Sequence, residues 1–374
     1  MVSSSQFARR ILVFAATFFA LSASQAFAQH YTQTNLTADM ASTATAANYD
    51  PLLVNAWGIS RSSTSPFWIS DNGTGFTTLY NGAGTPIPLG GTNGVMIPTP
   101  DGTGTATPTG TVWNYSKSFN VGTPNTPEPA VFLFVTEDGT ISGWNPNVDL
   151  KHAVLKVNRS KKAIYKGCAL VQTKNGVFLY VTNFKSGKIE IFDGSFTLVE
   201  TKELEFPGED FRFRNFVPFN IQNVGGNLVV TFARREPGST DEDHGAGLGL
   251  AGIFDTHLHL VTMMQHGSWF NAPWGVALAP ADFGSFSHRL LVANFGDGTI
   301  HAFNFATGEH EGAMLNTAGG TLAIDGLWGL TFGSGAANSG LPTELLFTAG
   351  PNDESNGLFG KLTATSTEQL GNTE

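Results

Sequence analysis

A Trp-Gly strand recurs six times at nearly even intervals, and this repeat constrains the fold more than any other feature of the chain. The template "NAPWGVALAP" (271–280) is matched directly by "NAWGIS" (55–60) and "IDGLWGLTFG" (324–333), and weaker copies are "PTGTVWN" (108–114), "YKGCALV" (165–171) and "FVPFNIQ" (216–222). Aligned on the tryptophan, the series runs Trp57, Thr109, Lys166, Phe219, Trp274, Trp328, at intervals of 52, 57, 53, 55 and 54 residues. Such even spacing indicates that each copy is one supersecondary unit of a repeat architecture.

Each copy continues with further apolar strands separated by turn residues. "FLYVTNFKSG" (178–187) precedes "KIEIFDG" (188–194), and "LLVANFGDG" (290–298) precedes "TIHAFNF" (299–305). Short β-branched and aromatic runs between Gly, Asn and Asp are typical of hairpins. Four short strands in each repeat of about 54 residues, repeated six times, predict an all-β fold, the six-bladed β-propeller. We expect the segment "YTQTNLT" (31–37) to pair with the last blade and close the ring.

The two ends of the chain lie outside this repeat. Arg9 and Arg10 precede an apolar stretch (11–21), and "AFA" (26–28) offers a small-x-small cleavage pattern, so residues 1–28 are predicted to be a signal peptide. The apolar stretch is short for a membrane span. We therefore expect an exported protein, periplasmic or extracellular, with no membrane span after cleavage. Its single propeller domain would cover residues 29–362, followed by a polar tail over 363–374.

Charge and cysteine usage narrow the possible partners. The net charge of −10 and the pI near 5.3 argue against nucleic acid and anionic membranes as partners. Cys168 is the only cysteine and cannot form a disulfide within the chain, so stability must come from the core. We interpret Cys168 as a small buried hydrophobic residue and expect a monomer.

Several motifs resemble known propeller families. The strand "WG-x-[AS]" followed by "YVTNF-x-x-G-x-I-x-[VI]FD" is similar to the NHL and YVTN families of six-bladed propellers. The motifs "NAWGIS", "WISDNGTGFTTLYNG", "TEDGTISGWNP" and "NFGDGTIHAFN" more closely resemble a family of exported bacterial propellers of unknown function, over residues 31–362. The resemblance implies the fold and brings no activity with it.

Polar residues at strand ends mark one face of the expected propeller. In propellers of this type the inner strand starts, and the second strand ends, on the top face, around the mouth of the central channel. Residues expected there are the carboxylates Asp71, Glu137 and Asp325 and the amides Asn55, Asn183, Asn271 and Asn294. Hard oxygen ligands of this kind suit Ca²⁺. Without an ion, the three crowded carboxylates would repel one another, and the pKa of at least one of them should rise. The alternative is that these side chains only cap turns by bonding backbone N–H groups.

The loop over residues 233–252 is the longest connection between a second and a third strand, and we expect it on the same face. It carries Arg234, a candidate ligand-binding residue, and an acidic run that includes Asp241 and Glu242. It is either a solvated mobile loop or a lid over the channel mouth. The recurring tryptophans are interpreted as packing residues.

Two functions from different classes follow. The first is a binding or scaffold propeller that presents its channel mouth and top loops to a protein, a glycan or a small-molecule ligand. The second is a hydrolase or lactonase that depends on a divalent, Ca²⁺-type ion, resembling the gluconolactonase-type propellers. In that case Asp71, Glu137 and Asp325 would hold the ion as a Lewis acid. The hydrolase patterns "G-x-S-x-G" and "HExxH" do not occur in the chain.

Overall fold

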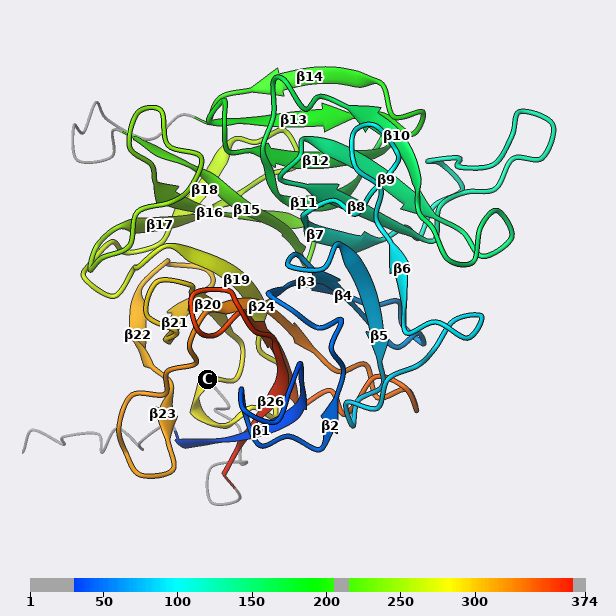
Figure 1. Cartoon of the computed structure of the whole chain (residues 1–374). Helices are drawn as coiled ribbons and strands as arrows, with labels where there is room; N and C mark the ends of the chain where they lie inside the picture. Colours follow the sequence, from blue (N-terminus) through cyan, green and yellow to red (C-terminus); the bar gives the residue numbers. More distant parts are fainter. Residues whose placement is uncertain (1–29, 205–214, 366–374) are drawn as a thin grey trace, which may run out of the picture.

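The computed structural model describes residues 30–204 and 215–365, and these residues form six mainly antiparallel sheets arranged as a β-propeller (Figure 1). Blade 1 contains β3 (Ala56–Ser60), β4 (Phe67–Asp71), β5 (Phe76–Tyr80) and β6 (Gly94–Met96). Blade 2 contains β7 (Pro108–Trp113), β8 (Phe132–Thr136), β9 (Thr140–Trp144) and β10 (Val154–Asn158). Blade 3 contains β11 (Tyr165–Thr173), β12 (Gly176–Asn183), β13 (Lys188–Phe192) and β14 (Leu198–Lys202).

The second half of the ring repeats this pattern. Blade 4 contains β15 (Phe216–Val224), β16 (Asn227–Arg234), β17 (Gly249–Phe254) and β18 (Leu260–Met263). Blade 5 contains β19 (Pro273–Leu278), β20 (Arg289–Asn294), β21 (Ile300–Asn304) and β22 (His310–Ala313), with the short 3₁₀ helix η2 (Gly284–Phe286) between its first two strands. Blade 6 contains β24 (Leu327–Phe332), β25 (Leu345–Ala349) and β26 (Leu358–Ala364). The six-bladed fold predicted from the repeat is confirmed.

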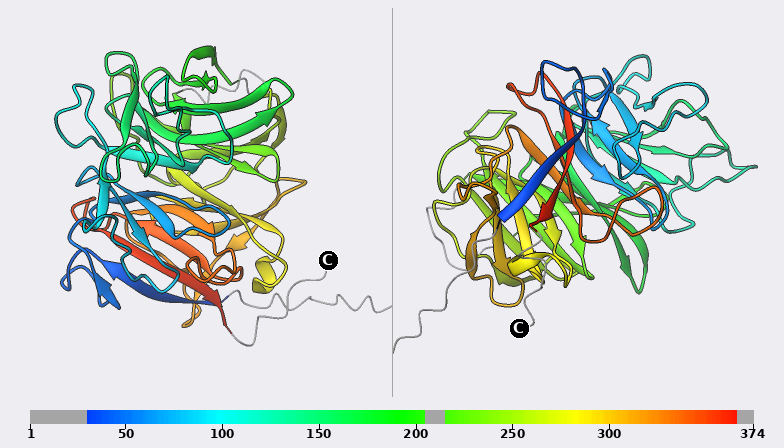
Figure 2. Two further views of the ribbon diagram at one scale, coloured as in Figure 1. Left: turned by 90° about the vertical axis from the view of Figure 1, so that its right-hand side faces the viewer. Right: turned by 90° about the horizontal axis from the view of Figure 1, so that it is seen from below.

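The N-terminal strand β1 (His30–Ala38) closes the ring. It pairs antiparallel with β26, from Tyr31 opposite Ala364 to Ala38 opposite Leu358, and Figures 1 and 2 show the two strands side by side. The short strands β2 (Asn48–Tyr49) and β23 (Leu315–Asn316) pair parallel with β1. The expected pairing of residues 31–37 with the last blade is thus confirmed, and β26 extends past residue 362, where the propeller was expected to end.

Every inner strand is interrupted by a β-bulge at the aligned repeat position. In β3 the register with β4 shifts between Ala56 and Ile59, which brackets Trp57, and each of the other five inner strands shifts at its own aligned residue. A bulge rotates a side chain out of the regular alternation of the strand. The six aligned positions, three of which are Trp-Gly, therefore mark six bulges, one in each inner strand.

The glycine that follows the tryptophan is required by close packing between neighbouring inner strands. A Cβ at Gly58 would lie 2.2 Å from the carbonyl oxygen of Thr109, and a Cβ at Gly275 would lie 2.2 Å from that of Trp328. Each contact is backbone of the next blade, which cannot move aside. The core itself fills the spaces between adjacent blades, and Cys168 is buried there, as the sequence indicated.

Residues 1–28, the predicted signal peptide, lie outside the described residues, as does most of the predicted tail. Across the part of the chain that the structure describes, no helix is long and apolar enough to cross a membrane.

Candidate ligand-binding site at the channel mouth

The six aligned residues are buried at equivalent positions of the inner strands, and five of them contact one another at the centre of the propeller. We call the set the axial ring: Trp57, Thr109, Lys166, Phe219, Trp274 and Trp328. The indoles of Trp57 and Trp328 stack with ring centroids 3.8 Å apart, and Trp274 lies edge-on to both, at 6.3 and 6.0 Å. Phe295 stacks on the other side of Trp328, also at 3.8 Å. The tryptophans are at most 5% exposed. They form an aromatic plug across the channel, as expected of packing residues.

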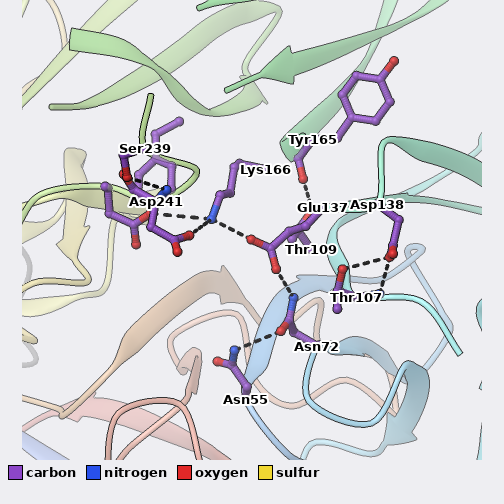
Figure 3. Close-up of polar contacts among 12 residues, drawn as sticks. Asn55, Asn72, Thr107, Thr109, Glu137, Asp138, Tyr165, Lys166, Ser239 and Asp241 are labelled. Carbon is purple, nitrogen blue, oxygen red and sulfur yellow. Dashed lines mark hydrogen bonds and ion pairs between the residues drawn. The ribbon is translucent and has the colours of Figure 1, made fainter. Parts of the chain in front are cut away.

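Lys166 is the one charged member of the axial ring. Its side chain is 1% exposed, and its Nζ lies 4.9 Å from the ring centroid of Trp57. The Nζ donates to Oε1 of Glu137 at 2.7 Å and to Oδ1 of Asp241 at 3.2 Å, and Oε2 of Glu242 lies 3.6 Å away. Figure 3 shows the ammonium group pointing between Glu137 on one side and Asp241 on the other. A buried ammonium needs such partners, because an isolated charge in the interior is very costly.

The charge state of Lys166 follows from these partners. Burial alone would lower the pKa of the ammonium, but the charges of Glu242, Glu137 and Asp241 together raise it well above its ordinary value. Burial likewise opposes ionisation of Glu242, yet the charge of Lys166 and the nearby imidazole of His244, whose Nε2 lies 3.8 Å from Oε1, outweigh it and lower the pKa of this carboxyl. Lys166 therefore stays protonated across the physiological range and cannot serve as an amine nucleophile, which requires the neutral form.

A cavity of about 570 Å³ lies above Lys166, and we call it the mouth cavity. Its lining residues are Thr107, Glu137, Asp138, Ile164, Lys166, Thr240, Asp241, Glu242, His244, Phe295, Asp353 and Glu354. Six of these carry carboxylates, against one lysine. Asp138 is committed to the backbone, since its Oδ2 accepts from the N–H and the hydroxyl of Thr107 at 2.7 and 2.9 Å. Glu242 is 4% exposed, and its buried Oε2 accepts no hydrogen bond from any residue within 30–204 or 215–365.

The excess of negative charge in this cavity affects the pKa of Glu354. Burial raises its pKa to about 7, and the charges of Glu242, Glu137 and Asp241 contribute to the rise. The residue lies in a left-handed turn in which Asn352, Asp353 and Glu354 have φ angles of 58°, 50° and 62°. Three such residues in succession are strained, and backbone strain of this kind collects at functional sites. Glu354 was not among the three carboxylates, Asp71, Glu137 and Asp325, for which the sequence led us to expect crowding, and burial is the main cause of the rise in its pKa.

Among the expected amides, Asn55 belongs to the network around the mouth cavity. Its Oδ1 accepts from Nε1 of Trp328 at 2.9 Å, and its Nδ2 donates to Oδ1 of Asn72 at 3.2 Å. Asn72 in turn donates from Nδ2 to Oε2 of Glu137 at 2.9 Å. A continuous chain of hydrogen bonds therefore runs from the aromatic plug to Lys166, and Figure 3 shows Asn72 between Asn55 and Glu137.

The other three amides bond mainly to neighbouring backbone. Asn183 accepts from the N–H of Ile164 and donates to Glu190, and Asn294 donates to the carbonyl oxygen of Trp269 at 2.7 Å. Asn271 accepts from the N–H of Gly245 at 2.7 Å, which fixes the long loop to blade 5. These contacts are those of the turn-capping alternative.

The three expected metal ligands have separate surroundings. Asp71 is fully buried in β4, where burial raises its pKa well above the ordinary value and the charge of Asp50 adds to the rise. Asp325 is exposed, and its Oδ2 accepts from the N–H of Asn352 at 2.8 Å. Glu137 pairs with Lys166. Over residues 30–204 and 215–365, no three His, Cys, Asp or Glu side chains form a group that could hold a metal ion, so Ca²⁺ stays a prediction without a preformed ligand set there.

The loop over residues 233–252 reaches across the channel mouth, which agrees with the lid interpretation. Asp241 and Glu242 in this loop contact Lys166, as described above. Arg235 donates to the carbonyl oxygens of Phe184 and Lys185 in blade 3. Arg234, the candidate ligand-binding residue, pairs with Glu236 and Asp243 within the loop itself. These pairs hold the loop conformation, and a ligand-binding role for Arg234 stays a prediction.

Comparisons with known proteins relate the chain to two viral proteins. No known family profile matches it. It is 31% identical over 326 residues to uncharacterized protein R648 of Acanthamoeba polyphaga mimivirus, covering 85% of this chain and 76% of the viral protein. Uncharacterized protein L690 of the same virus is 30% identical over 325 residues, covering 85% and 82%. The chain belongs to the family of these proteins.

Solved structures with a similar fold have much lower sequence identity to this chain than the two viral proteins have. A streptogramin B lyase shares 14% identity with a TM-score of 0.49, covering 90% of this chain and 98% of the other. The Pan2 WD40 domain of Neurospora crassa shares 9% identity with a TM-score of 0.43, covering 92% and 99%. Such values carry no argument about activity, so the function of the family has to be read from the site.

Sequence reasoning missed the central residue of the site, although the signal was present. Lys166 stands in the aligned series, where Trp57, Phe219, Trp274 and Trp328 occupy equivalent positions. A charged residue at an otherwise mostly aromatic repeat position predicts a buried charge that needs counter-charges nearby. Glu354 carried no comparable signal, because its environment depends on residues from several blades.

Proposed function

We propose that this protein is an exported, monomeric binding propeller whose mouth cavity takes a ligand carrying a protonated amine. The amine could belong to a free polyamine or to a lysine side chain of a partner protein. Relation to an exported bacterial family and to NHL-type propellers is part of this proposal. The observation that supports it is the imbalance of charge around the cavity: six carboxylates face one lysine, and no residue that the structure describes donates a hydrogen bond to the buried Oε2 of Glu242.

The cavity already accommodates one ammonium group. Lys166 is held by three carboxylates and by the faces of aromatic rings, with its Nζ 4.9 Å from Trp57 and 5.5 Å from the Phe184 centroid. Carboxylates together with aromatic faces are the groups that recognise organic cations. The three ion pairs of Lys166 are with Glu137, Asp241 and Glu242, and none of them involves the carboxylates of Asp353 and Glu354. They are available to a second cation.

Isothermal titration of the purified chain with spermidine tests this proposal. We expect one-to-one binding that weakens with salt and strengthens from pH 6 to pH 8, because Glu354, with its pKa of about 7, becomes charged over that range. Glu354→Gln should weaken binding about tenfold, since a hydrogen bond to a charged group is lost. Glu309→Gln, an exposed glutamate on blade 5 outside the cavity lining, is the matched control.

The outcome also separates the two function classes considered. Equal affinity of the wild type and Glu354→Gln, or no spermidine binding at all, would overturn the cation proposal. Ca²⁺ titrated in the same way tests the metal-dependent alternative. Binding of Ca²⁺ that is lost in Glu137→Gln would favour a metal site instead.

A further inference from the structure

A second cavity lies at the opposite end of the central channel, and we call it the lower cavity. It has a volume of about 470 Å³ and is lined by the inner strands of all six blades. The aromatic plug separates it from the mouth cavity, because Trp57 and Trp328 are almost completely buried between the two. It takes no part in the function proposed above.

The electrostatics of the lower cavity are the reverse of those of the mouth cavity. No Asp or Glu lines it, and Arg61, which follows β3, is its only charged residue. Tyr115 and Cys168 also line it, but burial raises the pKa of each and keeps both neutral. A ligand that enters this cavity therefore meets a positive field without a competing carboxylate.

Arg61 has unused capacity to bind an anion. Its Nε donates to the carbonyl oxygen of Phe332 at 2.8 Å, and its NH1 donates to that of Ser62 at 3.1 Å. No carboxylate within residues 30–204 or 215–365 forms an ion pair with it, and NH2 has no hydrogen-bond partner among these residues. The side chain is only partly exposed, and burial lowers its pKa. A half-buried guanidinium without a counter-ion is costly, and an entering anion would offset that cost.

The remaining lining residues indicate what the anion is attached to. Trp113 and Tyr115 form an edge-to-face pair with centroids 6.0 Å apart, and Tyr115 is 46% exposed at the cavity. Gln222 adds an amide that can both donate and accept. Aromatic walls with a few polar groups are typical of sites for small organic ligands, and the volume falls within the usual range.

We propose that the lower cavity binds a small organic anion, a carboxylate carried on a ring, with Arg61 holding the carboxylate and Trp113 and Tyr115 contacting the ring. Two parallel N–H···O bonds from an arginine suit a carboxylate better than a single point charge does. The site is independent of the amine site at the channel mouth.

Benzoate is the probe for this proposal, and benzamide is its neutral counterpart. We expect the purified chain to bind benzoate one-to-one, with quenching of tryptophan fluorescence, and to bind benzamide at least about tenfold more weakly. Arg61→Gln should weaken benzoate binding by about tenfold or more, and Arg61→Lys should fall between because it loses the forked geometry. Lys188→Gln removes the same charge from an exposed residue outside the cavity and should bind as the wild type does.

Several results would overturn the proposal. These are equal binding of benzoate and benzamide, unchanged affinity in Arg61→Gln, or no benzoate binding at millimolar concentration. The comparison of the two probes uses the wild-type chain and is decisive even if an Arg61 variant does not fold. Benzoate binding that is unchanged in chain saturated with spermidine would confirm that the two sites are separate. If spermidine fails to bind while benzoate binds, only the amine proposal is lost.

Discussion

Replacing Lys166 with methionine should destabilise the protein in a strongly pH-dependent way. Lys166→Met keeps most of the apolar stem but removes the ammonium that neutralises Glu137 and the buried Glu242, whose side chains are 25% and 4% exposed. Breaking a buried ion pair by deleting one partner costs about 3–5 kcal/mol. Asp241 is 73% exposed, so water screens its share and it adds little. For roughly 330 folded residues the entropy of unfolding is about 0.7 kcal/mol/K, so Tm should fall by about 4–7 °C.

The pH dependence follows from the state of Glu242 in each protein. In the wild type its pKa is lowered, so its contribution to stability is present above the unfolded value of about 4.3 and is lost as pH falls below it. In Lys166→Met the same carboxyl is buried without a cation, its pKa rises, and the variant recovers stability as the pH falls and the group takes up a proton. The deficit relative to the wild type should therefore be largest near pH 8 and smallest near pH 5.

Thermal and urea unfolding at pH 5, 6.5 and 8 measure this deficit. The double variant Lys166→Met/Glu242→Gln should recover part of the loss at pH 8, because it removes the orphaned charge. Lys188→Met is the matched control: its exposed ion pair with Glu203 should change stability by less than about 1 kcal/mol at every pH. A deficit of the same size at all three pH values, with no recovery in the double variant, would refute the electrostatic reasoning and leave only lost packing.

Two further predictions concern other parts of the fold. The buried carboxyl of Asp71 has a raised pKa, because burial outweighs the opposing effect of Thr78 and no described residue lies within normal hydrogen-bond distance of its oxygens. Its contribution to stability is therefore present below about pH 3.9 and is lost as pH rises through the folded pKa. Asp71→Asn should therefore be more stable than the wild type by about 1–3 kcal/mol at pH 8 and similar to it at pH 4, measured by urea unfolding; equal midpoints at pH 8 would contradict this. Deleting residues 30–38 removes β1 and exposes the edge of β26, so the shortened chain should aggregate on gel filtration, and a monomer with unchanged Tm would contradict closure by β1.

The fold could be predicted from the sequence because the repeat is local. The bulge recurs in every blade, and glycine follows the aligned residue in every blade except blade 4, where Asn220 takes its place. Each copy can therefore be recognised within one strand, although the contact that requires the glycine is with the next blade. The pairing of the N-terminal segment with the last blade follows from the need to cover an open sheet edge. The bulge and the glycine are requirements of backbone geometry, so they leave a recognisable pattern in the sequence of each inner strand.

The site could be predicted only in part, because its chemistry depends on contacts between blades. Glu137 and Asn55 were expected at the channel mouth, and both belong to its network. Asp71 follows the same strand-end rule, but its side chain turns into the interior of its blade, where no ion pair compensates it. The rule predicts which residue lies at the end of a strand, but it does not predict the direction in which its side chain points. That direction determines whether a carboxylate faces the channel mouth or is buried inside the blade.

Lys166, the one charged residue in the axial ring, accounts for the chemistry of both ends of the channel. The bulge at Lys166 directs its ammonium onto the axis, where tryptophans close the path below and leave no room for counter-ions on that side. The compensating carboxylates must then come from above, from the loop after β8 and from the loop over residues 233–252, and they bring more negative charge than one lysine neutralises. The plug that forces this arrangement also isolates Arg61, which receives no carboxylate from the mouth. A single channel thus acquires an acidic end suited to cations and a basic end suited to anions, separated by a layer of stacked indoles.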